Sequence, residues 1–158
     1  MPERPTASAV AGLPSGAEPT LLYIMKQVEL AVRARLDDIF RPIGMTALQY
    51  TALTVLERHP NMSTAQLARN SFVTQQTMTD MVTALEQHGL IERHRDPSDR
   101  RRMVLALTEA GRDLLDRYRP VVSDLEAEML GGLSRPETEE LRRSLLSCRA
   151  ALAGHPPR

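Results

Sequence analysis

One stretch of the sequence, residues 74–111, decides the fold: TQQTMTDMVTALEQHGLIERHRDPSDRRRMVLALTEAG. Its first part, 74–88, carries apolar residues at three- and four-residue spacing, which predicts an amphipathic helix. These apolar residues are Met78, Met81, Val82 and Leu85. Gly89 then supplies the left-handed conformation that commonly ends a helix. The helical pattern therefore stops at a defined point, and a different pattern begins after it.

After Gly89 the spacing of the apolar residues changes from about 3.6 to about two, which is typical of β-strands. The two runs are residues 90–95 and 103–108. The loop of 96–102 between them begins with Asp-Pro-Ser-Asp, a sequence typical of tight turns. We therefore expect a β-hairpin directly after the helix.

Three other helix starts carry complete local signals. Thr46, Ser63 and Ser134 are each followed three residues later by Gln or Glu. This pattern is a capping box, which satisfies two backbone N–H groups at a helix N-terminus. The helix that starts at Ser63 is short and is followed within a few residues by the helix of 74–88. The pair has the dimensions of a helix-turn-helix.

Longer amphipathic segments stand at both ends of the chain. Apolar residues recur at helical spacing over 20–41, and Pro42 stops that helix. Thr108 caps a second long helix, in which Pro120 is expected to cause a kink or a division into two. The last helix is predicted over 134–151. These helices carry more apolar surface than one chain of this size covers, and a second copy is the simplest partner.

The chain has 158 residues, which predicts one compact unit, and its formal net charge is zero, which by itself does not indicate a nucleic-acid partner. The charge is unevenly distributed, because residues 93–102 hold five Arg and two Asp, a local charge of +3. A hairpin with this charge attracts phosphate, and an arginine at its tip can enter the minor groove of DNA. The alternative interpretation is a solvated turn whose Asp–Arg pairs contribute little.

The start of the helix at 74–88 carries residue types that read base edges in the major groove. The candidate contacts are Thr74, Gln75, Gln76 and Thr77. Gln can bond bidentately to adenine, and Thr hydroxyls can reach phosphate oxygens. The alternative is that these residues only cap the helix and face solvent. Asp80 is repelled by phosphate, so it accepts from a cytosine amino group, pairs with a nearby arginine or points away, and these alternatives stay open.

Residues 89–111, together with the order of the helices, resemble the MarR family of winged-helix transcriptional regulators. The resemblance rests on Gly-Leu-Ile-Glu-Arg at 89–93 and on Asp-Pro-Ser-Asp-Arg-Arg-Arg-Met-Val-Leu-Ala-Leu-Thr-Glu-Ala-Gly at 96–111. It implies a homodimer, most simply a repressor, that binds a pseudo-palindromic operator, an inverted repeat in double-stranded DNA. It also implies a small, often aromatic, effector that binds near the junction of the two domains and weakens DNA binding.

The resemblance also assigns roles by position. Asp99 corresponds to the hairpin aspartate that pairs with an arginine, and Arg100 or Arg101 corresponds to the finger that enters the minor groove. The full set of candidate hairpin contacts is Arg95, Asp99, Arg100, Arg101 and Arg102. For the effector pocket, Tyr50 is the leading candidate, with Tyr23 and Met25 beside it. Ordinary core packing is the alternative for these three.

The predicted fold class is mostly α, of the α+β type: a winged helix-turn-helix with a helical dimerisation region. The winged helix-turn-helix is expected at 45–108, and the dimerisation region, built from the N- and C-terminal helices, at 19–42 and 109–153. We expect a flexible N-terminal arm over 1–18 and a flexible tail over 154–158. No stretch is apolar enough to span a membrane and no secretory signal is evident, so a cytoplasmic location is expected.

Cys148 is the one cysteine, and it supports a competing hypothesis. In that hypothesis the chain is a switch controlled by redox chemistry or by protein partners of the long helices. The apolar neighbours Leu145 and Leu146 instead favour a buried structural thiol. The sequence contains no Gly-rich phosphate loop, nucleophile elbow or metal-binding spacing, so it predicts neither an enzyme nor a cofactor.

Overall fold

The computed structural model describes residues 17–154. In chain order the elements are α1 (Leu21–Phe40), the 3-10 helix η1 (Arg41–Ile43), α2 (Ala47–Arg58), α3 (Thr64–Asn70), α4 (Gln75–Gln87), β1 (Ile91–Arg95), β2 (Met103–Leu107), α5 (Glu109–Met129) and α6 (Arg135–Leu152). The predicted arm and tail lie almost entirely outside the described residues. Among the helices of the described part, none is long and apolar enough to cross a membrane.

The α-helices begin where the sequence predicts because a hydroxyl side chain caps each one. Each capping hydroxyl accepts the backbone N–H three positions further on, and the capping residues are Thr20, Thr46, Ser63, Thr74, Thr108 and Ser134. At Thr46, Ser63 and Ser134 the Gln or Glu side chain also accepts the N–H of the capping residue, which confirms the three capping boxes. Each such cap contributes about 1 kcal/mol.

The end of α4 follows its glycine signal, whereas α5 departs from expectation at its proline. Gly89 adopts φ 70°, the left-handed conformation predicted for it. Pro120, in contrast, lies inside one continuous helix, so of the two predicted outcomes, a kink or a division, the division is excluded. Tyr118 and Val122, on either side of Pro120, pack against the core. These packing contacts stabilise the helix where Pro120, which lacks a backbone N–H, removes one helical hydrogen bond.

The predicted hairpin forms, and a third segment joins it. Strands β1 and β2 are antiparallel, with Ile91 opposite Leu107 and Arg95 opposite Met103. Met62, in the segment between α2 and α3, pairs with Leu105 of β2 through a backbone bond of 2.8 Å. The hairpin is therefore tied by backbone hydrogen bonds to the helix-turn-helix, which fixes its base relative to α3 and α4.

The core lies where α2, α3 and α4 pack under the hairpin, and it extends to the long helices through aromatic rings. Phe40, at the end of α1, is fully buried. Its ring stacks on Tyr50 of α2 with centroids 4.4 Å apart and meets Tyr118 of α5 at 5.1 Å. Three elements thus share one aromatic cluster at the point where the long helices join the rest of the molecule.

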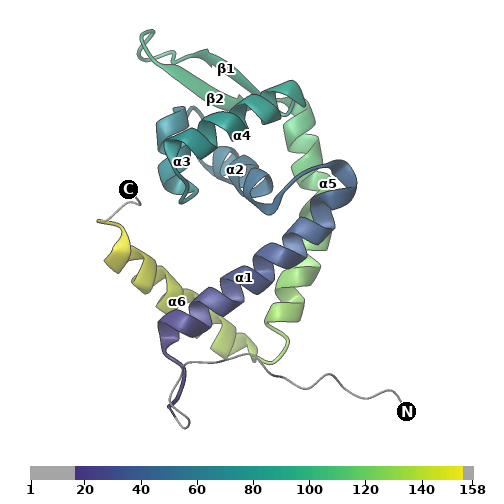
Figure 1. Ribbon diagram of the computed structural model, residues 1–158, viewed down its shortest axis with the longest axis vertical. Helices are drawn as coiled ribbons and strands as arrows, with labels where there is room; N and C mark the ends of the chain where they lie inside the picture. Colours follow the sequence, from purple (N-terminus) through teal and green to yellow (C-terminus); the bar gives the residue numbers. More distant parts are fainter. Residues whose placement is uncertain (1–16, 155–158) are drawn as a thin grey trace.

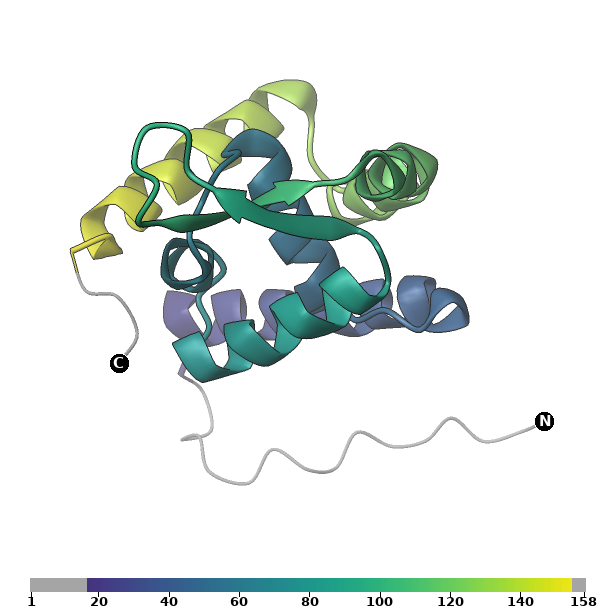
Figure 2. The ribbon, with the colours of Figure 1, turned by 90° about the horizontal axis from the view of Figure 1, so that it is seen from above.

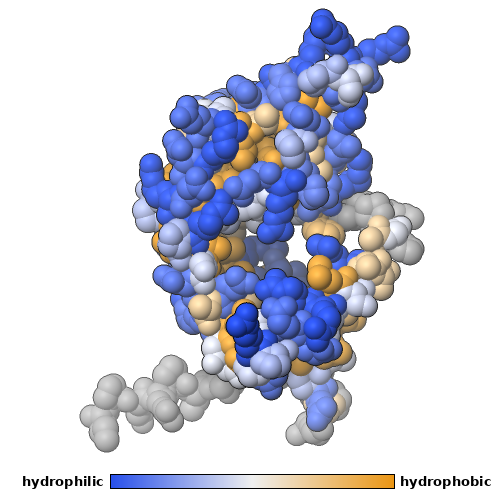
Figure 3. Space-filling view, turned by 180° about the vertical axis from the view of Figure 1, so that it is seen from behind, coloured by the Kyte–Doolittle hydropathy of each residue, from blue (hydrophilic) through white to orange (hydrophobic). Residues whose placement is uncertain are grey.

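Figure 1 shows the helix-turn-helix and hairpin as an upper part, with α1, α6 and the lower half of α5 diverging below it. The exposed large apolar residues are concentrated in the lower part: all except Phe72 and Met103 lie between Leu21 and Leu30 or between Val121 and Leu152. Figure 3, from the opposite side, shows orange apolar atoms among hydrophilic side chains in the lower part, and further orange surface on the upper part. The lower helices therefore carry large apolar surfaces that the described part of the chain leaves exposed.

Helix α6 contributes no buried residue to the described structure. As a consequence Cys148 is exposed, and the expectation of a buried thiol is wrong for this chain. The apolar neighbours that suggested burial, Leu145 and Leu146, are themselves 38% and 45% exposed. Helical periodicity predicted the apolar face of α6 correctly, but residues 17–154 do not bury this face.

Candidate nucleic-acid interface

Helix α4 presents a polar face to solvent. Its apolar residues Met78, Met81, Val82 and Leu85 are buried. The exposed positions of the helix are Gln75, Gln76, Thr77, Thr79, Asp80, Thr83 and Gln87. Seen from above in Figure 2, the start of α4 and the tip of the β1–β2 hairpin lie on the same side of the molecule. Two polar features that are separate in sequence thus share one surface.

The four residues predicted at the start of this helix divide into two pairs. Thr74 caps α4: its hydroxyl accepts the backbone N–H of Thr77 at 3.2 Å and donates to the Thr77 hydroxyl at 2.9 Å. The side chains of Gln75 and Gln76 are exposed. The Gln76 amide donates to the Asp80 carboxylate at 3.3 Å. The Thr hydroxyls therefore organise the helix start, and the Gln amides extend from it.

The turn of the hairpin is built around the carboxylate of Asp96. This carboxylate accepts the Ser98 backbone N–H at 2.9 Å and the Ser98 hydroxyl at 2.7 Å, and it lies 3.8 Å from the Arg102 guanidinium. The Ser98 hydroxyl and N–H, followed by the charge of Arg102, lower the pKa of Asp96 below its ordinary value. A carboxylate is thus kept ionised at the centre of the loop.

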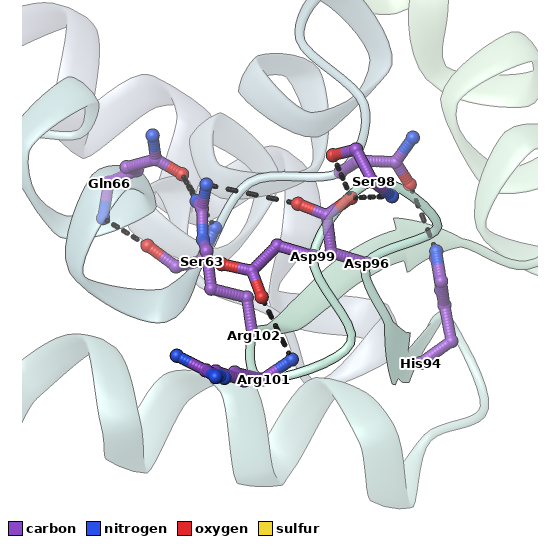
Figure 4. Close-up of polar contacts among 9 residues, drawn as sticks. Ser63, Gln66, His94, Asp96, Ser98, Asp99, Arg101 and Arg102 are labelled. Carbon is purple, nitrogen blue, oxygen red and sulfur yellow. Dashed lines mark hydrogen bonds and ion pairs between the residues drawn. The ribbon is translucent and has the colours of Figure 1, made fainter.

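Arg102 joins the hairpin to α3. Its guanidinium donates to Oε1 of Gln66 at 2.5 Å and also faces Asp96. The same Gln66 oxygen accepts the backbone N–H of Ser63 at 2.9 Å as part of the capping box. Figure 4 shows Arg102 reaching between Asp96 and Gln66. The arginine therefore holds the loop against the first helix of the helix-turn-helix.

The other arginines of the hairpin tip are differently placed. Arg95 donates to the backbone carbonyl of Arg100 at 2.8 Å, which braces the loop. The guanidinium groups of Arg100 and Arg101 make no hydrogen bond or ion pair with other residues in 17–154. In Figure 4 no contact is drawn to the Arg101 guanidinium. The tip thus carries two exposed positive charges, on Arg100 and Arg101, whereas Arg95 and Arg102 are engaged within the molecule.

The carboxylate that pairs with an arginine is not the one that was expected. Asp99 accepts the backbone N–H of Arg101 at 3.1 Å and makes no ion pair within the described residues. The pairing role belongs to Asp96, which is 9% exposed and faces Arg102. Asp99 was assigned by position, and the actual partner depends on which carboxylate the turn folds inward.

Sequence reasoning missed the roles of Asp96, Gln66 and Asn61. An Asp followed two residues later by Ser is the signal of an Asx-turn, so the first was detectable. Gln66 was recognised only as part of a capping box. Asn61 has φ 64°, and its side chain pairs with the His94 ring at 3.0 Å. This contact joins positions far apart in the sequence, and no local pattern announces it.

The chain does not bring the three predicted effector residues together. Tyr50 packs in the aromatic cluster with Phe40, and burial raises its pKa. Tyr23 lies 17 positions before Phe40 on α1, or about 25 Å along the helix axis. Tyr23 and Met25 are 40% and 49% exposed. Within one chain, Tyr50 is therefore a core residue and the other two belong to the uncovered surface of α1.

A hollow of about 740 Å³ lies between α1, α2 and α4. Its lining includes Arg33, Arg41, Met45, Leu48, Thr77 and Asp80. A smaller apolar hollow of about 250 Å³ lies between α5 and α6. The larger hollow combines arginines with apolar side chains and reaches the polar face of α4. A molecule that bound there would touch the helix that carries the candidate base contacts.

This fold, a helix-turn-helix followed by a basic β-hairpin, defines a winged helix-turn-helix protein. The MarR family model matches residues 45–103. An HTH-type transcriptional repressor of Mycobacterium tuberculosis is 32% identical over 123 residues, which cover 78% of this chain and 88% of the repressor. The chain therefore belongs to the MarR family of transcriptional regulators, as the sequence predicted. We call the β1–β2 hairpin the wing below.

Solved structures show the same fold. A Mycobacterium tuberculosis MarR family protein in complex with salicylic acid superposes with a TM-score of 0.68 at 30% identity, covering 83% of this chain and 97% of that one. The MepR–DNA complex of Staphylococcus aureus gives a TM-score of 0.73 at 22% identity, covering 84% and 96%. At the lower identity the likeness concerns the fold alone.

Proposed function

We propose that this protein is a repressor that binds an inverted-repeat DNA site as a homodimer, with α4 in the major groove and the wing in the adjacent minor groove. The observation that carries the proposal is that the start of α4 and the tip of the wing lie on one side of the molecule (Figure 2). The first carries the exposed amides of Gln75 and Gln76, and the second carries the uncompensated arginines. Arg100 and Arg101 are the proposed minor-groove and phosphate contacts. Such a regulator acts beside chromosomal DNA, in the cytoplasm.

Dimerisation is supported by the uncovered apolar surfaces of α1, α5 and α6. Seven large apolar side chains between Leu21 and Leu30 are at least 38% exposed, and α6 buries none of its own. A second copy of the chain offers the matching surfaces by two-fold symmetry. Two recognition helices related in this way reach successive major grooves about 34–36 Å apart. The proposed site is therefore an inverted repeat.

The test is the salt dependence of binding to a duplex that the protein selects from a random pool. We expect affinity to fall steeply between about 50 and 300 mM salt, because binding releases counterions from the neutralised phosphates. Arg101→Ala should weaken binding and reduce the salt slope by about one per wing. Arg117→Ala, which removes an exposed arginine of α5, is the matched control. Equal wild-type affinity at both salt concentrations would contradict the proposal.

We further propose that a small aromatic carboxylate binds the hollow between α1, α2 and α4 and releases the DNA. Arg33 and Arg41 are the cations of its lining; each also pairs with a carboxylate outside the lining, Glu29 and Asp38 respectively, and a bound carboxylate would be a further partner. Met45 and Leu48 supply apolar contacts. The relative crystallised with salicylic acid supports this ligand class. The hollow reaches Thr77 and Asp80, so an occupant can shift α4.

Salicylate is the probe for this effector site. It should raise the melting temperature of the free protein and weaken operator binding, since a ligand of the free state opposes the DNA-bound state. Arg41→Ala should reduce both effects, whereas Arg117→Ala should leave them unchanged. If salicylate stabilised both variants equally, the hollow would not be the site.

A further inference from the structure

We infer that Asp80 is a specificity-determining residue: its carboxylate accepts a hydrogen bond from the amino group of a cytosine in each half of the DNA site. The inference rests on the proposed function, because it requires α4 to lie in the major groove. It assigns a role to the one charged side chain among the exposed positions of the first two turns of this helix. The sequence alone left that role open.

Asp80 lies on the face of α4 that would meet DNA. It follows Gln76 by one helical turn, and both are exposed, whereas the flanking apolar residues Met78 and Met81 are buried on the other side. The Gln76 amide nitrogen donates to the Asp80 carboxylate at 3.3 Å. The bond places the Asp80 side chain on the same side of α4 as the exposed Gln76 amide, which supports a base contact over a side chain that points away.

The structure also removes the arginine alternative. Asp80 makes no ion pair within residues 17–154. Arg33 and Arg41 line the same hollow as Asp80, but Arg33 pairs with Glu29 and Arg41 pairs with Asp38 at 2.6 Å. The negative charge of Asp80 is therefore not neutralised by these neighbours, and among the described residues its hydrogen-bond partner is the Gln76 amide alone. One carboxylate oxygen remains for an external donor.

The chemistry of a carboxylate then selects the base. An ionised carboxylate only accepts hydrogen bonds. In the major groove guanine offers the acceptors N7 and O6 and thymine offers O4, all of which repel it. Adenine offers an amino group beside the N7 acceptor, whereas cytosine offers its N4 amino group without a neighbouring acceptor on the same base. Cytosine is therefore the base that Asp80 favours.

The same charge disfavours contacts that carry no sequence information. A carboxylate on the DNA-facing side of α4 repels phosphate, so it weakens binding to unrelated duplexes while it strengthens binding to the correct base. Both effects, stronger binding to the specific site and weaker binding to other duplexes, raise the ratio of specific to non-specific affinity. A residue with only a structural role would change neither the preferred base nor this ratio.

The experiment compares duplexes selected from a random pool by the wild type, by Asp80→Asn and by Asp113→Asn. The Asn side chain at position 80 keeps an acceptor for Gln76, so the fold is preserved, which melting temperatures check. Asp113→Asn removes one negative charge from an exposed site on α5 and is the charge-matched control. We expect the wild type to enrich an inverted repeat with cytosine at one fixed position of each half-site.

Asp80→Asn should enrich the same repeat without that cytosine preference, a loss of roughly tenfold in discrimination. It should also bind an unrelated duplex more tightly than the wild type, whereas Asp113→Asn should match the wild type in base preference. If Asp80→Asn kept an unchanged cytosine preference, or if no fixed cytosine appeared, the inference would be overturned while the proposed function stood. If the wild type enriched no motif at all, the proposed function itself would fail.

Discussion

Arg101 and Arg102 are adjacent in the sequence, yet the structure gives them different roles. Arg102 is held by Asp96 and Gln66, whereas the Arg101 guanidinium extends from the tip. The sequence offers no basis for separating them, because both are arginines in one basic run. The difference arises from the turn, which directs Asp96 inward. A rigid loop that carries a free arginine loses less conformational entropy on binding DNA.

The Asp96 carboxylate should make the wing sensitive to acid. Its pKa is lowered in the folded state, so its contribution to the free energy of unfolding is present above the ordinary value of 3.8 and is lost as the pH falls through the folded value. We expect Asp96→Asn to lower the melting temperature at pH 6. The difference in melting temperature between Asp96→Asn and the wild type should become smaller below about pH 3.8.

The measurement is a series of melting curves between about pH 6 and 2.5 for both proteins. Asp99→Asn is the matched control, because Asp99 lies in the same loop without an ion pair among the described residues. Its melting temperature should follow the wild type across the series. If the difference in melting temperature between Asp96→Asn and the wild type were the same at every pH, the ionised Asp96 carboxylate would not be the group that stabilises the wing.

At the scale of elements, the start of α5 docks against the end of α4. The Thr108 hydroxyl donates to the Gly89 carbonyl at 2.6 Å, and the Thr108 backbone N–H donates to the Leu90 carbonyl at 3.1 Å. Gly111 lies so close to this segment that a Cβ on it would stand 2.2 Å from the Leu90 carbonyl oxygen. The Leu-Thr-x-x-Gly pattern at 107–111 therefore reflects a close approach of two backbones.

Gly111→Ala should be strongly destabilising for this reason. The clash is with backbone, which has little freedom to move, so we expect a loss of about 2–3 kcal/mol in the free energy of unfolding. This corresponds to roughly 5–10 °C in melting temperature. Gly132→Ala is the control, since a Cβ there meets nothing within 4 Å. Equal melting temperatures for the two variants would contradict the close approach of Gly111 to the Leu90 carbonyl.

At the scale of the whole molecule, one aromatic cluster connects two parts with different surfaces. Phe40, Tyr50 and Tyr118 join α1, α2 and α5. Arg119 of α5 adds a bond of 2.8 Å to Glu57 of α2. The upper part is a packed winged helix-turn-helix, whereas the lower part exposes apolar helices. The lower helices are therefore connected to α2 of the upper part through this cluster and the Arg119–Glu57 pair.

Leu145→Asp should convert the protein to a monomer. Leu145 lines the apolar hollow between α5 and α6, where a charge would have to be buried by a partner chain. Sedimentation velocity should show a dimer for the wild type and a monomer for the variant. Met103→Asp, at an exposed apolar site on β2, should remain dimeric. A dimeric Leu145→Asp variant would contradict the proposed interface.

Local patterns determine much of this fold because they act within a few residues. The Ser and Thr caps, Gly89 and the change of period at 89–91 set the helices and strands, and the predicted strands differ from the structure by one residue each. The basic wing and the polar start of α4 were also visible in the sequence. These features depend on backbone hydrogen bonds and helical periodicity, which the neighbouring residues supply.

Only the tertiary structure decided how those features meet. It selected Asp96 over Asp99 as the partner of an arginine, placed Tyr50 in the core away from Tyr23, and left Cys148 exposed on an uncovered helix. It also placed the Asp80 carboxylate on the exposed side of α4, bonded to Gln76. The physical reason is common to all four: the outcome depends on contacts, or on missing contacts, that are fixed only when the elements pack.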